Sequence, residues 1–599
     1  MEMNTAPEIS QLVWQTKYRA EGETSIRDTW QRVANAVASV EADADEWSGR
    51  FYAILKDFKF LPGGRILAGA GTRKQVTLFN CFAMGLIEDS LDGIFESLKE
   101  GALTMQHGGG VGYDFSTLRP KGTPARSVGG IASGPVSFMH IWDVTCAILL
   151  STGSRRGAMM ATLRCDHPDV EDFIEAKRDP NVLRNFNLSV KVTDDFLKAV
   201  EKDEEWLLVF PQAALADGVG EGAVLREWPG YPGPVPCKIL KRLPARDLWH
   251  RLMQATYDVA EPGVLFIDRI NHLNNLYYCE KIHITNPCSE IPLPPYGACD
   301  LGSINLVRFV RDPFTPEARL DFQAIEALVP VAVRFLDNVI DLSRFPLTRQ
   351  KAQAHKTRRI GLGLTGLADV LIMLGLHYDS DAARELAEKI MATICHAAYR
   401  ASVALAKEKG AFPAFEAEPY LDGAFVTGLP NDIRDAIAKH GLRNSHLTAI
   451  APTGSISLLA GNVSSGLEPV FSFRYQRRIQ LAGTECRMVD VEDAAYRLWR
   501  KIYSDKPLPS TFVTATELSP NAHLVMQAVL QKHVDNAISK TIHIPEDYPF
   551  EDFQNVYLRA YQLGLKGCTT YRPSPVRGTV ILPQTVPDRH CCDIDREGD

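Results

Sequence analysis

The feature that most limits the fold is an alternation that starts near Phe60, where short β-branched runs are cut by glycine-rich turns such as LPGGRILAGAG and MQHGGGVGYDF. Amphipathic helical patterns lie between them, for example at residues 92–105 and 320–342. Strands that alternate with helices over most of a chain are typical of a large α/β architecture. We therefore predict an α/β fold, and no internal repeat is visible that would suggest a solenoid.

The chain divides into three predicted regions. Residues 1–59 are expected to be helical, because Trp30, Val33, Val37 and Val40 recur at helix spacing. Residues 60–575 carry the alternating α/β pattern, within which the Gly- and Pro-rich segment 213–245 is expected to be a surface excursion. Residues 576–599 are predicted to form a mobile tail that contains a Cys-Cys pair.

Composition narrows the class of protein. The 599 residues are 45% hydrophobic and 23% charged, as in globular domains. A net charge of −8 gives no general reason to expect a nucleic acid or an anionic membrane as partner. The start, MEMNTAPEISQLVWQ, lacks the basic and apolar segments of a secretory signal, and no apolar run is long enough to span a bilayer. We expect a cytoplasmic location.

The twelve cysteines are too sparse for a disulfide scaffold. They show no pair of CxxC units and no CxxC/HxxxH combination, so we predict no metal site. Cysteines that carry function in a reducing compartment should be reactive ones. The candidates are Cys81, Cys288, Cys299 and the tail pair Cys591 and Cys592.

The most informative segment is HITNPCSEIPLPPYGACDLGSINL, residues 283–306. Asn286, Cys288 and Glu290 lie at i, i+2 and i+4, so an extended backbone would point all three side chains the same way. Pro287 and Pro292 oppose a helix here. An amide, a thiol and a carboxylate that converge can bind hydroxyls, donate a hydrogen atom and accept a proton. Taken alone, the motif would more often be a loop with a buried, inert cysteine.

Two further segments carry candidate binding groups. In MQHGGGVGYDF, glycines would let the backbone approach a ligand closely. In HLTAIAPTGSISLLAGNVSSGLEPVFSF, an apolar run at residues 447–451 leads into a strand-to-helix turn at residues 452–457. Free amides and hydroxyls at such a turn form an anion site suited to phosphate, although a simple helix cap would have the same pattern.

The ordered motifs NCF, HGGGVG, RRGA, NFNLSV, NPCSE, GLGLTGLAD, APTGSIS and GLEP together resemble the ribonucleotide reductase family across roughly residues 60–575. That resemblance implies a ten-stranded α/β barrel with a central finger loop that carries the radical cysteine. It implies that the Cys288 thiyl radical takes the 3′ hydrogen of the ribose. Glu290 would act as base at the 3′ hydroxyl, and Asn286 would hold the neighbouring hydroxyls. Cys81 and Cys299 would supply two electrons and become a disulfide as the 2′ hydroxyl leaves as water.

The resemblance also implies nucleotide contacts. Asn80 and Gly109 would meet the nucleoside, as would Arg65, at a place where many relatives have a small hydroxyl residue. Asp89, with the loops at residues 121–133 and 177–185, resembles a specificity site for deoxynucleoside triphosphate effectors. The stretch GLGLTG, residues 361–366, matches a dinucleotide fingerprint but follows no predicted strand, so we interpret it as helix packing. The phosphates would be held by Pro452, Thr453, Gly454, Ser455 and Ile456.

The class of reductase depends on the source of the radical. Subunits fed by a separate radical protein carry two adjacent tyrosines near the end of the barrel, whereas GLKGCTTYRPSP has Tyr571 alone. The sequence instead resembles the adenosylcobalamin-dependent class. The alternatives are a subunit that receives its radical from a partner, and a catalytically silent nucleotide-binding relative. A silent relative has no reason to retain the whole set of Cys81, Asn286, Cys288, Glu290 and Cys299.

Partners follow from the same resemblance. It favours ribonucleoside diphosphates as substrates, a homodimer, and a thioredoxin-like reductant that acts through the tail. Relatives have residues between their two tail cysteines, but Cys591 and Cys592 are adjacent, and an adjacent pair can form only a strained ring.

Overall fold

The computed structural model describes residues 6–124, 130–149, 158–179, 181–216, 218–480 and 486–573. The predicted tail, residues 576–599, lies outside these residues. Among the described helices, none is long and apolar enough to cross a membrane. The boundaries of the three predicted regions stay a prediction.

The N-terminal region forms the short helix α1 (Glu8–Val13) and the helices α2 (Ile26–Ala38) and α3 (Ala44–Leu55). Ser25 begins α2 with a capping box, in which its side chain and that of Asp28 bond reciprocally to the backbone. Trp30 is buried in edge-on contact with Phe58. The expected apolar stripe ends early, because Val40 lies beyond the end of α2 and is exposed.

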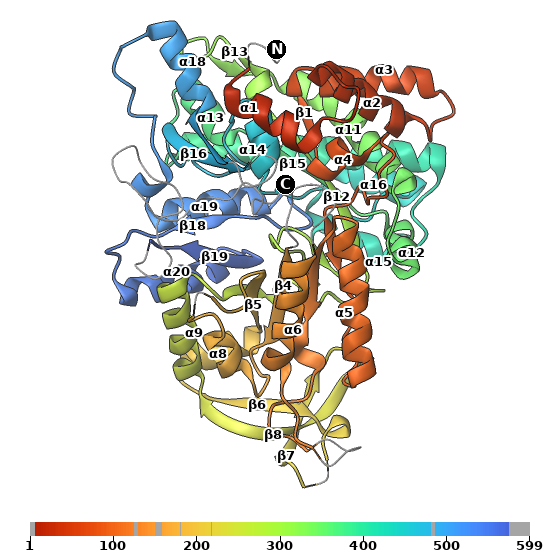
Figure 1. Cartoon of the computed structure of the whole chain (residues 1–599), viewed down its shortest axis with the longest axis vertical. Coiled ribbons are helices and arrows are strands. Elements are labelled where there is room, and N and C mark those ends of the chain that lie inside the picture. Colours follow the sequence, from red (N-terminus) through yellow and green to blue (C-terminus); the bar gives the residue numbers. More distant parts are fainter. Residues whose placement is uncertain are drawn as a thin grey trace.

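A ten-stranded sheet forms the centre of the molecule (Figure 1). Five neighbouring strands are parallel, in the order β2-β3-β4-β5-β9. Two further parallel pairs are β12 with β15 and β18 with β19. These parallel groups meet in antiparallel pairs, β12 with β2 and β19 with β9, while β1 pairs antiparallel with β12. The strands are β1 (Phe60–Pro62), β2 (Cys81–Ala83), β3 (Gly110–Asp114), β4 (Met159–Arg164), β5 (Phe186–Val192), β9 (Gly263–Phe266), β12 (Ala298–Asn305), β15 (Ile360–Thr365), β18 (Thr541–His543) and β19 (Gly567–Tyr571).

Two parallel bridges lead from the β18 end of the sheet back to β15. Ile450 pairs with Ile538, just ahead of β18, and Thr448 pairs with Leu362 of β15. These isolated bridges lie between the β18 end of the sheet and β15, which is where the sheet of a barrel would close. The predicted α/β barrel architecture agrees with this arrangement.

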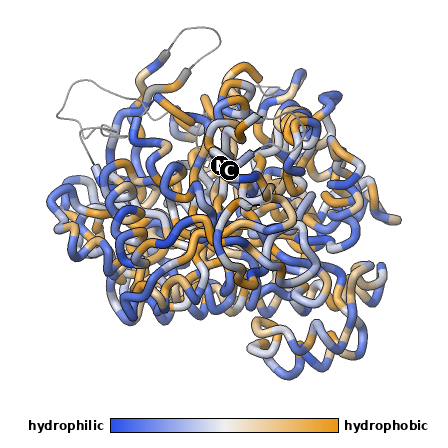
Figure 2. Tube along the Cα trace, turned by 90° about the horizontal axis from the view of Figure 1, so that it is seen from below, coloured by the Kyte–Doolittle hydropathy of each residue, from blue (hydrophilic) through white to orange (hydrophobic). Residues whose placement is uncertain are grey.

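Helices cover the sheet. They include α5 (Leu91–Gln106), α6 (Pro135–Ile148), α9 (Ala245–Val259), α11 (Phe322–Leu342), α14 (Asp381–Lys409) and α20 (Phe550–Gln562). Figure 2 shows hydrophobic and hydrophilic residues alternating along the elements, as expected where each has one buried face. In Figure 1 the N-terminal helices lie at one end of the molecule beside α11, and the sheet β6–β8–β7 lies at the other.

The predicted surface excursion is more ordered than its composition suggests. Its residues supply β7 (Glu221–Glu227) and β8 (Pro234–Pro244), which join β6 (Glu205–Pro211) in a three-stranded sheet. Phe210, Trp228 and Cys237 are buried in a small hydrophobic cluster of their own. The segment lies at the periphery, as expected, but it is a sheet rather than a loop.

The interpretation of GLGLTG as helix packing is wrong, because these residues form most of β15. A Cβ on Gly363 would lie 2.1 Å from the carbonyl oxygen of Ala449, and one on Gly361 would lie 3.0 Å from the Ala449 side chain. The glycines therefore let the chain at residues 447–451 lie directly against β15.

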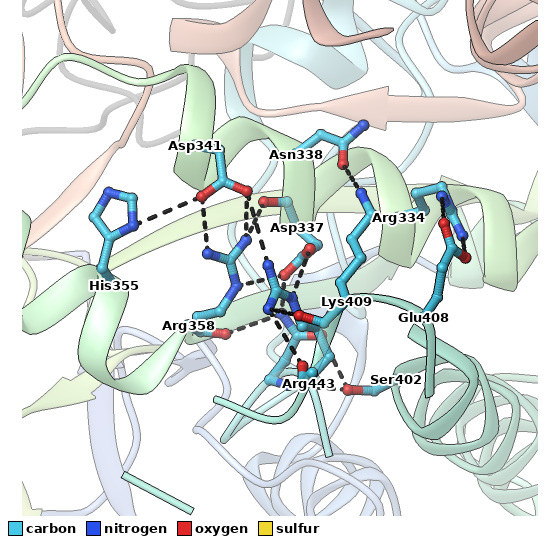
Figure 3. Close-up of polar contacts among 12 residues, drawn as sticks. Arg334, Asp337, Asn338, Asp341, His355, Arg358, Ser402, Glu408, Lys409 and Arg443 are labelled. Carbon is cyan, nitrogen blue, oxygen red and sulfur yellow. Dashed lines mark hydrogen bonds and ion pairs between the residues drawn. The ribbon is translucent and has the colours of Figure 1, made fainter. Parts of the chain in front are cut away.

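A buried ion-pair network fixes the chain at the start of β15 (Figure 3). Arg358 follows α12 (Thr348–Thr357) and has a left-handed backbone, with φ 46°. Its guanidinium contacts Asp337 and Asp341 of α11 at 2.8 Å each, and Arg443 donates to Asp337 at 3.2 Å. Since a buried charge is costly unless it is paired, this network strongly constrains where β15 begins.

Candidate active site

The Cys288 segment is the tip of a short hairpin. Strands β10 (Ile284–Thr285) and β11 (Pro292–Leu293) pair antiparallel, and the Asn286 amide N–H donates to the Ile291 carbonyl at 3.2 Å. The Asn286 side chain accepts a hydrogen bond from the Ile291 N–H at 3.0 Å, which closes the turn. The expected extended backbone across residues 286–290 is therefore wrong: these residues form a turn, in which Ser289 has φ 66°. We call residues 284–293 the Cys288 hairpin.

Glycines of β3 seat this hairpin. A Cβ on Gly112 would lie 2.0 Å from the Thr285 carbonyl oxygen and 2.8 Å from Ile284, while one on Gly110 would lie 3.2 Å from Pro287. The HGGGVG motif thus lets the hairpin lie directly on β3. The close approach that its glycines permit is to another part of the chain, rather than to the ligand we expected.

Cys81 and Cys299 lie side by side on neighbouring strands, and Cys81 contacts the hairpin. They are register partners on β2 and β12, and both are buried free thiols. Antiparallel partners have Cα atoms roughly 4.5–5.5 Å apart, within the span of about 4.4–6.8 Å that a disulfide needs. The register therefore places the two cysteines where a disulfide could form, as the proposed electron path requires.

The hairpin brings its polar side chains to Cys81. Asn286 Nδ2 lies 3.1 Å from the Cys81 sulfur, which lies 3.7 Å from Glu290 Oε1. Burial, with the Glu290 carboxylate next in effect, raises the pKa of the Cys81 thiol well above its usual value. Burial, followed by Asp300, does the same for the pKa of Cys299. Both sulfurs are thus held as neutral thiols, which can give up hydrogen.

Cys288 differs from these two thiols because it is only half-buried and lines a cavity of about 610 Å³. It lies close enough to Cys81 to contribute to the raised pKa of that thiol. The same cavity reaches the predicted phosphate turn. Residues that line it include Met160, Asn187, Ser289, Pro452, Gly454, Ser457, Gln527, Gln531, Lys540, His543, Lys566 and Tyr571.

The predicted phosphate residues fall into two groups. Pro452 and Gly454 line the cavity, whereas Thr453, Ser455 and Ile456 are buried. Thr453 begins α17 (Gly454–Leu459) with φ 52°, and its hydroxyl oxygen accepts the Gly466 N–H at 2.9 Å. The Ser455 hydroxyl pairs with that of Tyr18 from the N-terminal region. The buried hydroxyls therefore shape the turn.

Among the predicted nucleoside contacts, Asn80 is the one whose side-chain amide has no hydrogen-bond partner within the described chain. The residue is 8% exposed, and neither the nitrogen nor the oxygen of its side-chain amide has a hydrogen-bond partner. A buried amide without partners costs about 1–3 kcal/mol, so it points to a ligand that would satisfy it. By contrast, the two other predicted nucleoside contacts lie against parts of the chain itself. A Cβ on Gly109 would lie 2.6 Å from the Phe82 ring, and one on Gly108 would lie 2.6 Å from the Arg65 guanidinium.

Asp89 lies beside the start of α5, where Arg119 Nε pairs with its carboxylate at 2.8 Å. Parts of the two loops predicted to join it in an effector site lie outside the described residues, as do Cys591 and Cys592. The roles of all these side chains stay predictions.

Sequence reasoning passed over Asn187 and Lys566, which line the cavity with Cys288. Asn187 lies within the NFNLSV motif, and Lys566 lies one residue ahead of β19. The NFNLSV motif marked the segment that contains Asn187, but no pattern in the sequence indicated which group its side chain would contact.

Two family models and several known proteins match this chain. Residues 7–75 match the family model "Ribonucleotide reductase, all-alpha domain", and residues 79–571 match "Ribonucleotide reductase, barrel domain". A Mycobacterium tuberculosis protein named vitamin B12-dependent ribonucleoside-diphosphate reductase is 38% identical over 93% of this chain and 77% of its own length. A Thermoplasma acidophilum protein of the same name is 37% identical over 91% of this chain and 68% of its own length.

A more distant relative is the ribonucleoside-diphosphate reductase subunit alpha of Chlamydia pneumoniae, 28% identical over 90% of this chain and 56% of its own length. The two family models together span the helical region and the sheet that carries the Cys288 hairpin. The chain belongs to the ribonucleotide reductase family.

Proposed function

We propose that this chain reduces ribonucleoside diphosphates to 2′-deoxyribonucleotides, using a radical generated from adenosylcobalamin. The observation that carries the proposal is the arrangement of thiols. Cys288 faces a cavity, while the same hairpin brings Asn286 and Glu290 to the buried pair of Cys81 and Cys299. The relatives with 37–38% identity are named for this substrate class and this cofactor.

The residues around the cavity fit such a cofactor. Gln527 and Gln531 line the cavity, and their buried side-chain oxygens have no hydrogen-bond partner. They could accept hydrogen bonds from the amide groups of a corrin, and His543 and Tyr571 offer aromatic faces to a nucleoside. When bound, adenosylcobalamin supplies a carbon-centred radical able to take the hydrogen atom of the Cys288 thiol.

The side chains of this protein would then carry the reduction. Cys288, as a thiyl radical, takes the 3′ hydrogen, Glu290 accepts the 3′ hydroxyl proton and Asn286 holds the neighbouring hydroxyls. Cys81 and Cys299 each give up one proton and one electron and become joined by a disulfide, and Cys288 returns the hydrogen atom to C3′ at the end of the turnover. The 2′ hydroxyl leaves as water and a hydrogen takes its place, so that two thiols are exchanged for one disulfide and one water. The raised pKa values of Cys81 and Cys299 favour this role, because both protons are retained until they are used.

Regulation and assembly form part of the proposal. Asp89 and the neighbouring loops would bind a deoxynucleoside triphosphate effector. Two covering helices expose apolar side chains, and a second copy of the chain would bury them in a homodimer. These are Leu91, Phe95 and Leu103 on α5, and Val144 and Ile148 on α6. A thioredoxin-like protein would reduce the disulfide by way of Cys591 and Cys592. The cytoplasmic location stays a prediction.

The test is an assay of the purified chain with a small dithiol as reductant and no second protein. We expect deoxynucleotide from cytidine diphosphate only when adenosylcobalamin is added. Product that requires a separate radical-generating subunit instead would contradict the cofactor assignment. Binding of nucleotide with no product under either condition would identify a silent relative. Turnover of the triphosphate but not the diphosphate would overturn the substrate assignment alone.

A further inference from the structure

We infer that Asn187 and Lys566 are positioning residues that fix the location of Cys288 by holding its hairpin from two parts of the cavity wall. The inference rests on the proposed function, in which Cys288 is the radical cysteine. Neither residue touches the reacting atoms in this account. Each acts through a backbone carbonyl next to, or two residues from, Cys288.

Asn187 holds the hairpin on the side of β5. Its Nδ2 donates to the Pro287 carbonyl at 2.8 Å, across 100 positions of sequence. That carbonyl belongs to the peptide bond that joins Pro287 to Cys288, so its direction is tied to the Cys288 backbone. β5 is paired along its length with β4 and β9, which makes it a firm support.

Lys566 acts through the turn at residues 535–537. The Ala537 N–H donates to the Glu290 carbonyl at 2.8 Å, on the other side of Cys288. The Lys566 ammonium donates to the carbonyls of Asp535, at 2.6 Å, and Asn536. Lys566 is 3% exposed, and its bonds tie this turn to the start of β19.

The turn is also fixed from its other face, so Lys566 completes a rigid support. The Asp535 carboxylate accepts the N–H groups of Leu447 and Thr448, at 2.8 and 2.9 Å, and the Tyr399 hydroxyl at 2.8 Å. Burial lowers the pKa of Lys566 to about 7, which reflects how completely the ammonium is removed from water.

The hairpin needs such supports because each of its strands has only two residues. A two-stranded hairpin of this length is not stable alone. Since reacting atoms must be held within a fraction of an ångström, loss of either support should lower the rate of the chemical step without changing nucleotide affinity.

The test compares Asn187→Leu and Lys566→Met with the matched controls Asn555→Leu, at an exposed position of α20, and Lys532→Met, at an exposed ion pair. We expect kcat to fall about tenfold or more in the two test variants, with KM and the affinity for adenosylcobalamin within about twofold of the wild type. Asn187→Gln, which keeps the amide donor on a longer arm, should recover part of the rate. Because Asn187 lies at the cavity surface, its variants should fold even if Lys566→Met does not.

A second readout needs neither cofactor nor turnover. The rate at which iodoacetamide alkylates Cys288, located by mass spectrometry, should change severalfold in the test variants and not in the controls. Wild type that makes no deoxynucleotide would overturn the proposed function, while this readout would still test the positioning. Alkylation and kcat equal to those of the controls would overturn the inference, as would a parallel fall in kcat, nucleotide affinity and melting temperature.

Discussion

Replacement of Gly112 by alanine tests whether the Cys288 hairpin is seated on β3. The new Cβ would lie 2.0 Å from the Thr285 carbonyl oxygen, whereas real Cβ contacts stay beyond 3.0 Å, so strand and hairpin must separate by about 1 Å. Overpacking of this kind costs about 1–3 kcal/mol of the free energy of unfolding. A displacement of about 1 Å at the reacting thiol can lower a rate by about a hundredfold.

The matched control is Gly49→Ala in α3, where a Cβ meets no heavy atom within 4 Å. There the substitution should stabilise the helix by about 0.5–1 kcal/mol. Urea unfolding and initial rates of deoxynucleotide formation measure both effects. If Gly112→Ala unfolds at the same urea concentration as the wild type and keeps its rate, the hairpin is not seated as described.

Three further predictions address pH, the nucleotide and the tail. Burial lowers the pKa of His167 to about 4, and its Nδ1 accepts the Asp169 N–H, so between pH 4 and about 6.5 the unfolded chain binds more protons than the folded one. Stability should therefore fall by up to about 3 kcal/mol as the pH drops through this window, and His167→Gln should flatten the fall in urea unfolding; an unchanged slope would exclude this histidine as the cause. Asn80→Leu should raise KM for the nucleotide while stability holds or rises, because it removes a buried amide without partners; an unchanged KM would remove Asn80 from the binding site. Cys591→Ser/Cys592→Ser should lose multiple turnover with a thioredoxin-like reductant and recover it with a small dithiol, whereas undiminished turnover with the protein reductant would show that the tail is not the shuttle.

Much of the architecture follows from local sequence. The alternation of strands and helices predicted an α/β fold, because both periodicities are properties of the chain alone. The resemblance added the barrel and drew attention to Cys81, Cys288 and Cys299. The adjacency of Cys81 and Cys299 comes from the register of β2 on β12, however, which no spacing along the chain specifies.

The two wrong interpretations have different physical causes. Residues 286–290 alternate like a strand, but the ladder ends at Thr285 and the Asn286 side chain closes a turn. GLGLTG suggested helix packing, yet Gly361 and Gly363 lie in a strand, because residues 360–365 pair with β12, and their lack of a Cβ leaves room for Ala449. In the first case a local side-chain hydrogen bond overrides the alternating pattern, and in the second the pairing with a distant strand does. The role of Asn187 could not be predicted either, because its hydrogen bond to Pro287 joins residues 100 positions apart in the sequence.

The most direct measurement of the central claim is the product formed by Cys288→Ser. A hydroxyl holds its hydrogen too tightly to give it up to a carbon radical, so this variant should bind the ribonucleoside diphosphate as tightly as the wild type. With adenosylcobalamin and a dithiol, it should form no deoxynucleotide, whereas the wild type turns over. Deoxynucleotide formation by Cys288→Ser at a substantial fraction of the wild-type rate would contradict the account. Among the described cysteines, Cys288 is the one that lies in the hairpin and also lines the cavity.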